Sequence, residues 1–250
     1  MKILCVSDQI DPLVYSTQAK ERFSDIDLVL CAGDLPSDYI DFIVSTLNKP
    51  TYFIFGNHNL SEFSYYHKQK KHTGAHPTWQ EEHTILDMKG SFGATYVGFK
   101  SLSDKKLIVS LPNGKKRPLL IAGVSGSIRY NNGLNQYTDQ QMFFHLLALT
   151  PRLLWNRIRY GTYLDIFLTH ASPRHIHDKE DPCHKGFECF NAFIKHFQPT
   201  FLVHGHIHLY DMNSPRITKV GKTTVVNAYS HTILCLDYEN ENQEQAKENE

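Results

Sequence analysis

Apolar runs that are typical of β-strands recur along this chain, and five of them are followed at once by polar residues able to bind a metal ion. The runs cover residues 3–6, 28–32, 52–55, 166–168 and 201–203. The segments behind them are Asp8, Gly33-Asp34, Gly56-Asn57-His58-Asn59, Thr169-His170 and Gly205-His206-Ile207-His208. Open sheets bind ligands beyond the carboxyl ends of their strands, so we expect these segments to share one crevice.

Helical spacing of apolar residues predicts helices between and beside these strands. One helix has Ser37 as its cap and stops ahead of Pro50. Another begins at Thr138, and we expect it to break at Pro151 and to resume through residue 160. A third covers residues 186–197. Further strands are predicted at residues 95–99, 106–111, 119–123, 217–220, 223–227 and 231–238.

This order of elements predicts an α/β fold made of two β-rich halves, each with helices on its outside. The expected architecture is a two-sheet β-sandwich flanked by helices on both outer faces. No linker-like composition divides the halves, so we expect one domain over residues 1–238. Within it, residues 60–90 lack a clear pattern and are predicted to form an inserted loop or cap. Residues 239–250 are acidic and lack large apolar groups, which predicts a disordered tail.

Composition narrows the classes of function. The 250 residues include 26 basic and 26 acidic side chains, and the sequence pI is about 7.3. This balance argues against extended electrostatic binding of nucleic acid, because such binding requires a stripe of basic residues on the surface. No apolar run approaches the ~18 residues that a transmembrane helix needs. The five cysteines are odd in number, form no CxxC pair and include three inside apolar strands, namely Cys5, Cys31 and Cys235. This is typical of buried cysteines in a reducing compartment, and we expect a cytoplasmic protein.

The side chains at the strand ends are carboxylates, an amide and imidazoles. Such donors suit borderline divalent metals, namely Mn, Fe, Co, Ni or Zn. The Gly before a ligand block has a physical use, because Gly33, Gly56 and Gly205 allow the backbone to turn sharply there. In the segment from His206 to His208, the spacing of two would place both imidazoles on one face.

The blocks resemble those of the calcineurin-like metallophosphoesterase superfamily, written D-x-H, GD, GNH, H and GH-x-H. The resemblance runs from Met1 to about Tyr238 and is strongest to the small cyclic-nucleotide-type phosphodiesterase-like members, which also carry Thr-His-x-x-Pro at the position of Thr169-His170. One block departs from the pattern, because Ile10 stands where the family has a histidine ligand.

The resemblance implies one or two divalent metal ions and a small phosphorylated substrate. One ion would be held by Asn57, His170, His206 and Asp34, with Asp34 bridging to the second. The second ion would take Asp8, His208 and Asp34. In such a site two ions about 3.5–4 Å apart clamp the reacting oxygens, and a shared water with a pKa near ~7 supplies hydroxide. His58 would protonate the leaving oxygen or stabilise its developing charge.

Ile10 leaves two interpretations open. The second metal position is weaker and filled by water, or Asp11 or a loop histidine replaces the missing ligand. Asp11 also fits a structural role, as an acidic residue that begins a helical turn ahead of Pro12.

Two loops supply candidates for substrate binding. The segment 174–184 lies behind His170, and its charge mixture fits either a solvated loop or contacts to phosphate and to the metal ligands. Its candidate residues are Arg174, His177, Asp178 and His184. The segment 126–132 follows a strand, and its Arg129 could fork onto phosphate oxygens.

The leading hypothesis is therefore metal-dependent hydrolysis of a small phosphodiester or phosphomonoester. The alternative from another class is a catalytically weak scaffold that binds other proteins, because scaffold relatives lose ligands in these same blocks. A nuclease is the third hypothesis, disfavoured by the charge balance. The sequence leaves the oligomeric state open.

Overall fold

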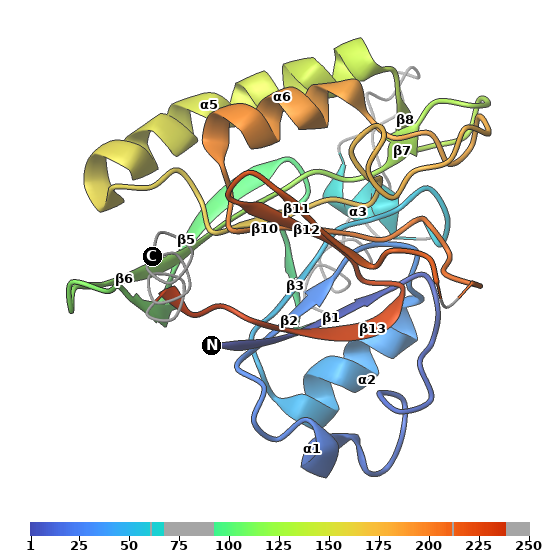
Figure 1. The fold of residues 1–250 in the computed structure, drawn as a ribbon. Coiled ribbons are helices and arrows are strands. Elements are labelled where there is room, and N and C mark those ends of the chain that lie inside the picture. Colours follow the sequence, from blue (N-terminus) through green and yellow to red (C-terminus); the bar gives the residue numbers. More distant parts are fainter. Residues whose placement is uncertain (61, 68–92, 212, 239–250) are drawn as a thin grey trace, which may run out of the picture.

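The computed structural model describes residues 1–60, 62–67, 93–211 and 213–238. Two β-sheets pack face to face, with α1 (Ala19–Arg22), α2 (Ser37–Leu47) and α3 (Phe63–Tyr66) on the side of the first sheet and α5 (Asp139–Tyr160) and α6 (Glu188–Phe197) outside the second (Figure 1). The predicted helix-flanked sandwich is therefore confirmed.

The first sheet joins the two ends of the described chain. Its order is β13 (Ser230–Cys235), β1 (Lys2–Ser7), β2 (Leu28–Cys31), β3 (Thr51–Phe53), β4 (Thr95–Tyr96). Strands β1 to β4 run parallel, whereas β13 pairs antiparallel with β1, so that Lys2 faces Cys235 and Ser7 faces Ser230.

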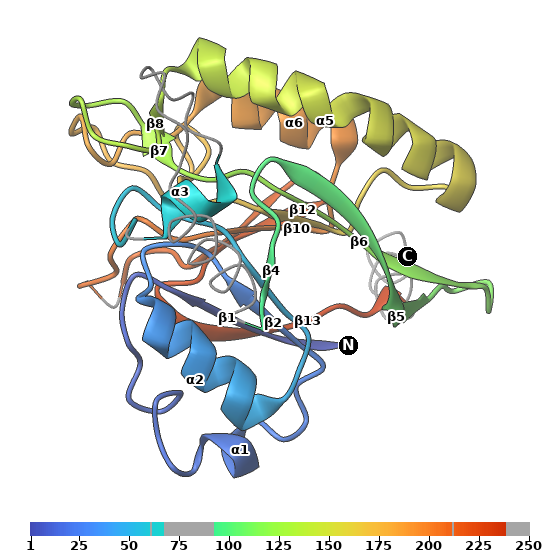
Figure 2. The same cartoon turned by 180° about the vertical axis from the view of Figure 1, so that it is seen from behind.

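The second sheet is mixed and lies between the first sheet and the long helices (Figure 2). Its order is β11 (Ile217–Val220), β12 (Thr223–Asn227), β10 (Phe201–His204), β9 (Ile166–Leu168), β6 (Lys116–Gly123), β5 (Lys100–Ser110). Short strands β7 (Ser127–Ile128) and β8 (Gln136–Tyr137) pair separately. Strands β6, β9, β10 and β12 are parallel, so their carboxyl ends share one edge.

Alternate side chains of β1 show how the layers are held together. Ile3 and Cys5 face the second sheet, in the core between the sheets, whereas Leu4 and Val6 pack against α2. All four are fully buried. Strands covered on both faces read as continuous apolar runs, which is why these runs are visible in the sequence.

Helix α5 is continuous, so the predicted break at Pro151 is wrong. It begins after Thr138, whose hydroxyl accepts a hydrogen bond from the Gln141 amide at 3.2 Å while the Gln141 side chain accepts one from the Thr138 amide. Proline removes one helical donor and leaves the carbonyl four residues earlier without its partner. That residue is Leu147, which is 51% exposed and therefore lies on the solvent side of α5.

Two other sequence expectations have different outcomes. The prediction of Ser37 as the cap of α2 is wrong, because Pro36 occupies the N-cap position and Ser37 is the first residue of the helix. The Ser37 hydroxyl instead donates a hydrogen bond to Glu62 at 2.6 Å. The predicted loop or cap at residues 60–90 contains α3, whereas residues 68–90 and the predicted tail at 239–250 lie outside the described residues. Within the described ranges, no helix combines the length and apolar character that crossing a membrane requires.

Candidate metal centre

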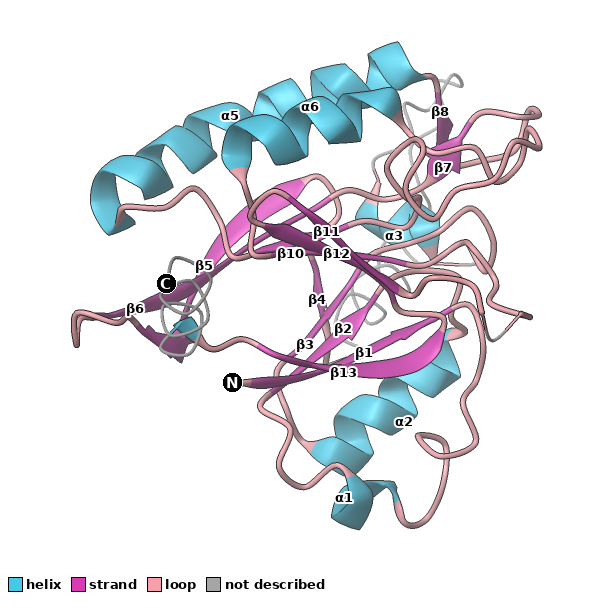
Figure 3. Ribbon diagram, viewed as in Figure 1, coloured by secondary structure: helices cyan, strands magenta, loops and turns pink. Residues whose placement is uncertain are grey.

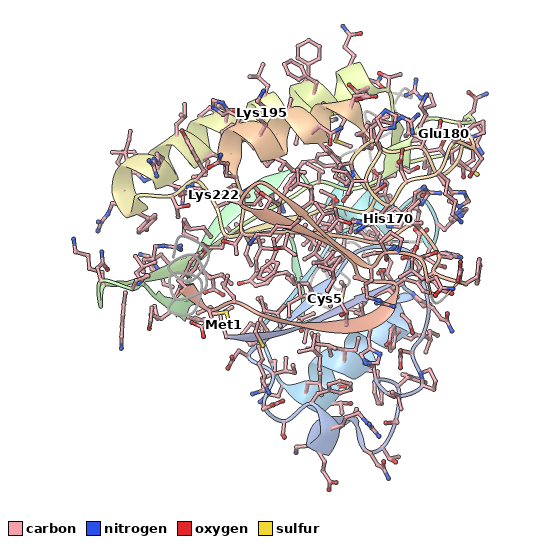
Figure 4. The ribbon with its side chains drawn as sticks, in the orientation of Figure 1. Met1, Cys5, His170, Glu180, Lys195 and Lys222 are labelled. Atoms are coloured by element: carbon pink, nitrogen blue, oxygen red, sulfur yellow. The ribbon has the colours of Figure 1, made fainter. Side chains whose placement is uncertain are left out.

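The five ligand-bearing segments meet at one end of the sandwich, where the long loops gather (Figure 3). Figure 4 places His170 on this side of the molecule, with Glu180 on the loops beyond it and Met1 at the opposite side. Hydrogen bonds join the segments across the two sheets. The carboxylate of Asp8, behind β1, accepts hydrogen bonds from the amide of His206, behind β10, at 2.9 and 3.0 Å. The Gly205 amide donates to the His170 carbonyl at 3.0 Å.

The glycines ahead of the ligands are required for close approach. A Cβ on Gly56 would lie 2.0 Å from Asp34 Oδ1, and one on Gly205 would lie 2.5 Å from Asp8 Oδ2. Gly33 has φ +96, so the sharp turn predicted there is present. Gly56 and Gly205 are not among the positive-φ glycines of the described chain, and the chain bends directly behind each of them. A side chain at either position would occupy space that the ligands fill.

Three of the left-handed backbone conformations at this end of the sandwich belong to candidate ligands. Asp8, Asp34 and His206 have φ values of 63, 55 and 68. A non-glycine residue in this region is strained, by about 1–3 kcal/mol each, and persists only where its surroundings fix it. Such strain concentrates at functional sites, and here it turns three side chains toward a common point.

Two buried ligand atoms lack a hydrogen-bond partner in the described part of the chain. They are Asn57 Oδ1 and His170 Nε2. The other ring nitrogen of His170 donates to the Ala32 carbonyl at 2.9 Å, which leaves the lone pair on Nε2. Buried polar atoms are normally hydrogen-bonded, so both atoms are candidates for contact with a ligand; His170 Nε2 also lies 3.3 Å from Asp34 Oδ2. These donors fit a divalent metal ion.

His206 completes this set from the second sheet. Its Nε2 donates to the Cys183 carbonyl at 2.6 Å, which leaves Nδ1 free to bind a metal. One ligand atom from each of Asp34, His170 and His206 lies within 4.8 Å of the others. Burial, followed by the charge of His170, lowers the pKa of His206 to about 3, so the ring is neutral at physiological pH.

The buried carboxylates create a need for positive charge. Burial opposes ionisation of Asp34, but the nearby His170, whose Nε2 is 3.3 Å from Asp34 Oδ2, outweighs it and holds the pKa of Asp34 at about 2. Burial also opposes a charged His170, but Asp34 outweighs it and raises the pKa of His170 to about 9. Burial raises the pKa of Asp8. A divalent cation would balance these charges without a proton on His170.

The sequence profile of the calcineurin-like phosphoesterase family matches residues 1–210 of this chain. The chain belongs to the calcineurin-like phosphoesterase family. Members of this family are generally metal-dependent hydrolases that act on phosphoesters, and the resemblance seen in the sequence is confirmed.

Solved structures agree on the fold of this phosphoesterase-family chain. The crystal structure of TT1561 from Thermus thermophilus is 15% identical, with a TM-score of 0.55, over 95% of this chain and 90% of that chain. A second solved structure is 12% identical, with a TM-score of 0.57, over 93% of this chain and 94% of that chain. No curated protein sequence matches the chain significantly.

The second metal position of the family is less complete in this chain. His208 Nε2 lies 3.8 Å from Asp8 Oδ1, and the ring is stacked on Tyr229. Ile10 is 43% exposed and offers no donor atom. Asp11 does not replace it, because its carboxylate already accepts hydrogen bonds from Ser230 and His231, and from the Leu13 amide. The hydrogen bond from the Leu13 amide to the Asp11 side chain matches the structural role expected for Asp11, at the start of a helical turn.

His58 is held beside the ligands by its main chain. The His58 amide donates to Asp34 Oδ1 at 2.7 Å, and its side chain is exposed. The side chain of the next residue, Asn59, donates to the Asp34 carbonyl at 3.0 Å. The position is therefore fixed at the entrance of the site, with the ring free to reach a substrate.

Three of the substrate-binding candidates have other partners. Arg174 is buried and forms ion pairs with Asp178 at 2.6 Å and with Glu180 at 2.8 Å, so its charge is already neutralised. Asp178 also accepts from the Gly186 amide at 3.0 Å. His177 bonds to His204 at 2.9 Å and to Thr218 at 2.8 Å, so both ring nitrogens are occupied. These contacts give each of the three residues a structural role, within the loop or against β10 and β11.

The remaining two candidates differ in their distance from the centre. Arg129 bonds to the Gln136 carbonyl and to the Gln141 side chain, next to β8 and the start of α5. The ring of His184 lies 5.4 Å from the ring of His206, and its Nδ1 lies 2.8 Å from Asp181. His184 is thus brought to the metal centre, whereas the guanidinium of Arg129 is held by its own loop and helix.

Other residues at the centre were missed by the sequence analysis. The Tyr130 hydroxyl accepts a hydrogen bond from the Asn57 side chain at 3.3 Å, which directs Asn57 Oδ1 toward the metal position. The Asn135 side chain donates to the Gly56 carbonyl at 2.6 Å and to the Phe55 carbonyl. Tyr130 adjoins Arg129, so the sequence analysis identified the loop but not this side chain. Nothing in the sequence around Asn135 signals its contact.

Proposed function

We propose that this chain hydrolyses a small phosphodiester or phosphomonoester with the help of divalent metal ions. The observation that carries the proposal is the cluster of Asp34, His170 and His206, in which one ligand atom of each residue lies within 4.8 Å of the others. Asn57 Oδ1, behind a neighbouring strand, is buried without a hydrogen bond in the described structure and supplies a fourth candidate donor.

The ligand roles follow from the positions of these residues. Asn57, His170 and His206 would hold one ion together with Asp34. Asp8 and His208 would hold a second ion, and Asp34 would bridge the two. When bound, such ions polarise the phosphoryl oxygens and lower the pKa of water toward ~7. Mn, Fe, Co, Ni and Zn all suit this set of oxygen and nitrogen donors.

His58 is the proposed acid. Its exposed ring lies next to a metal ligand, and its amide bond to Asp34 fixes the position from which it would donate a proton to the leaving oxygen. The ring would stabilise the same developing charge if the leaving oxygen needs no proton.

The zero net charge supports a small phosphorylated substrate rather than nucleic acid. The free cysteines, three of which are buried, support the cytoplasm as the site of action.

Metal analysis combined with turnover tests the proposal. Protein purified without chelator is expected to contain a transition metal and to hydrolyse bis-p-nitrophenyl phosphate with added Mn²⁺. Replacing His170 with Gln should remove both properties. The control is His196→Gln, which changes an exposed histidine on α6. Metal-free protein that regains no Mn²⁺ would contradict the proposal.

A catalytically weak scaffold is the second candidate, and Ile10 is the observation that favours it. The second position has fewer protein donors than the family pattern, and the contacts of Asp11 prevent a local replacement. Bound metal without measurable turnover, over a range of phosphomonoesters and phosphodiesters, would favour this scaffold over the enzyme.

A further inference from the structure

A tight turn beside the metal centre carries a carboxylate, a thiol and an imidazole. The turn runs over Asp181-Pro182-Cys183-His184 and is closed by a hydrogen bond from the His184 amide to the Asp181 carbonyl at 3.2 Å. The side chains of Asp181 and His184 are 43% and 32% exposed, so solutes can reach them.

The three donor atoms of this turn converge. Cys183 Sγ lies 2.8 Å from Asp181 Oδ1 and 3.5 Å from His184 Nδ1, and His184 Nδ1 lies 2.8 Å from Asp181 Oδ1. In a tetrahedral zinc site, bonds of about 2.3 Å to sulfur and about 2.0 Å to nitrogen separate the two ligands by about 3.5 Å. The sulfur and nitrogen are therefore already at the required spacing. The exposed carboxylate has to retreat by less than about 1 Å.

We propose that Asp181, Cys183 and His184 form a peripheral binding site for a zinc-class divalent cation, separate from the candidate metal centre. Three protein ligands plus a water molecule make a four-coordinate site, and partial exposure leaves room for that water. Thiolate, imidazole and carboxylate are all zinc ligands, whereas the candidate centre offers oxygen and nitrogen only.

Binding exchanges one proton for the metal. The Cys183 thiol donates its proton in a hydrogen bond to the Asp181 carboxylate at 2.8 Å. The sulfur–metal bond then forms as the thiol proton leaves to water.

The peripheral site is coupled to the candidate centre through one peptide group. The Cys183 carbonyl accepts the hydrogen bond from His206 Nε2 that leaves Nδ1 of that ring free. A cation held by the side chains of Cys183 and His184 would fix this carbonyl in place. Occupancy of the peripheral site thus orients a ligand of the centre without touching it.

Cobalt spectroscopy tests the proposal independently of catalysis. Co²⁺ is titrated into the metal-free full-length protein, and absorption is recorded in the near ultraviolet, where a bound thiolate gives a charge-transfer band. The candidate centre lacks a thiolate, so its cobalt gives no such band. Because the candidate centre also takes up cobalt, we expect the amplitude of the band to correspond to one thiolate-bound Co²⁺ per chain once all sites are filled, and the band to be lost when Zn²⁺ is added.

Two cysteine variants make the test specific. Cys183→Ser should abolish the band while keeping the main-chain carbonyl that His206 uses, and the matched control Cys235→Ser, at an exposed cysteine on β13, should keep it. His184→Ala should weaken cobalt binding at least tenfold. Circular dichroism establishes that each variant is folded. A wild type without the band, a band that survives Cys183→Ser, or one that Zn²⁺ fails to remove would overturn the proposal. Loss of hydrolytic activity would not affect this readout.

Discussion

Replacing Gly56 with Ala should damage the metal centre while leaving the fold intact. The new Cβ would lie 2.0 Å from Asp34 Oδ1 and 2.6 Å from His170 Cε1. Contacts under 3.0 Å are essentially never made by a real Cβ, so the Asp34 oxygen has to move by about 1 Å or more. Gly56 is not in the left-handed region, and alanine therefore adds no backbone strain there.

Such a shift acts on the ligand in two ways. It breaks the 2.7 Å bond from the His58 amide, and it displaces the carboxylate that would bridge both ions. We expect metal affinity to fall by at least roughly 10–100-fold, the usual effect of disturbing an orienting partner. Turnover should fall by about 10²-fold, because a misplacement of about 1 Å has this effect.

The assay compares Gly56→Ala with Gly114→Ala. Gly114 lies in the turn between β5 and β6, with φ +73 and open space around its Cβ position. Alanine there should cost about 1 kcal/mol of stability and leave Mn²⁺ affinity unchanged. Calorimetric Mn²⁺ titration, turnover and thermal unfolding are measured for both. Wild-type Mn²⁺ affinity and turnover in Gly56→Ala would refute the close-packed geometry described here.

Further changes give separate tests. His58→Ala should keep bound metal and lower turnover by roughly 10²–10⁴-fold, and loss of metal instead would reverse its assignment. Ile10→His should raise the affinity for the second metal ion by at least about 10-fold, as measured by calorimetric titration. Two wild-type sites of equal, high affinity would show instead that the missing histidine is already compensated. Arg117→Ala should destabilise the protein to urea by about 3–5 kcal/mol, because it leaves the fully buried Asp165 carboxylate, now bonded at 2.6 and 2.7 Å, without its partner. Burial lowers the pKa of His177 from 6.5 to about 4, so the unfolded chain takes up the proton first as the pH falls. The free energy of unfolding should therefore fall by about 2 kcal/mol between pH 6.5 and pH 4, after allowing for the partial exposure of the ring. In urea unfolding measured across this pH range, His177→Gln should reduce that fall.

The sequence predicts the fold well because this fold is built from strands covered on both faces. Ile3 to Val6 form a continuous apolar run for that reason, and a strand end followed by Asp or His identifies the edge where ligands gather. The break predicted at Pro151 is absent because a proline disrupts a helix most where the surroundings cannot accommodate it. Whether the preceding turn, at Leu147, faces solvent or the core depends on the tertiary structure, which the local sequence does not give.

The parts of the site that the sequence does not reveal depend on contacts between distant residues. Arg174 looks like a phosphate ligand until its carboxylate partners are located. His177 meets Thr218 across more than forty positions, and Asn135 meets Gly56 across about eighty. Spacing within one segment carries no information about such pairs, because they depend on which strands become neighbours.

The pairing of β1 with β13 has a consequence for how the protein is made. The strand that leads to Asp8 is synthesised more than two hundred residues before its antiparallel neighbour, which begins only at Ser230. At about 5–20 residues per second, β1 waits roughly 10–50 s with one edge unpaired, a condition that favours wrong associations. The centre is thus completed only after β13 has been synthesised. A chain that ends before Ser230 would keep every proposed metal ligand and still lack the strand beside Asp8.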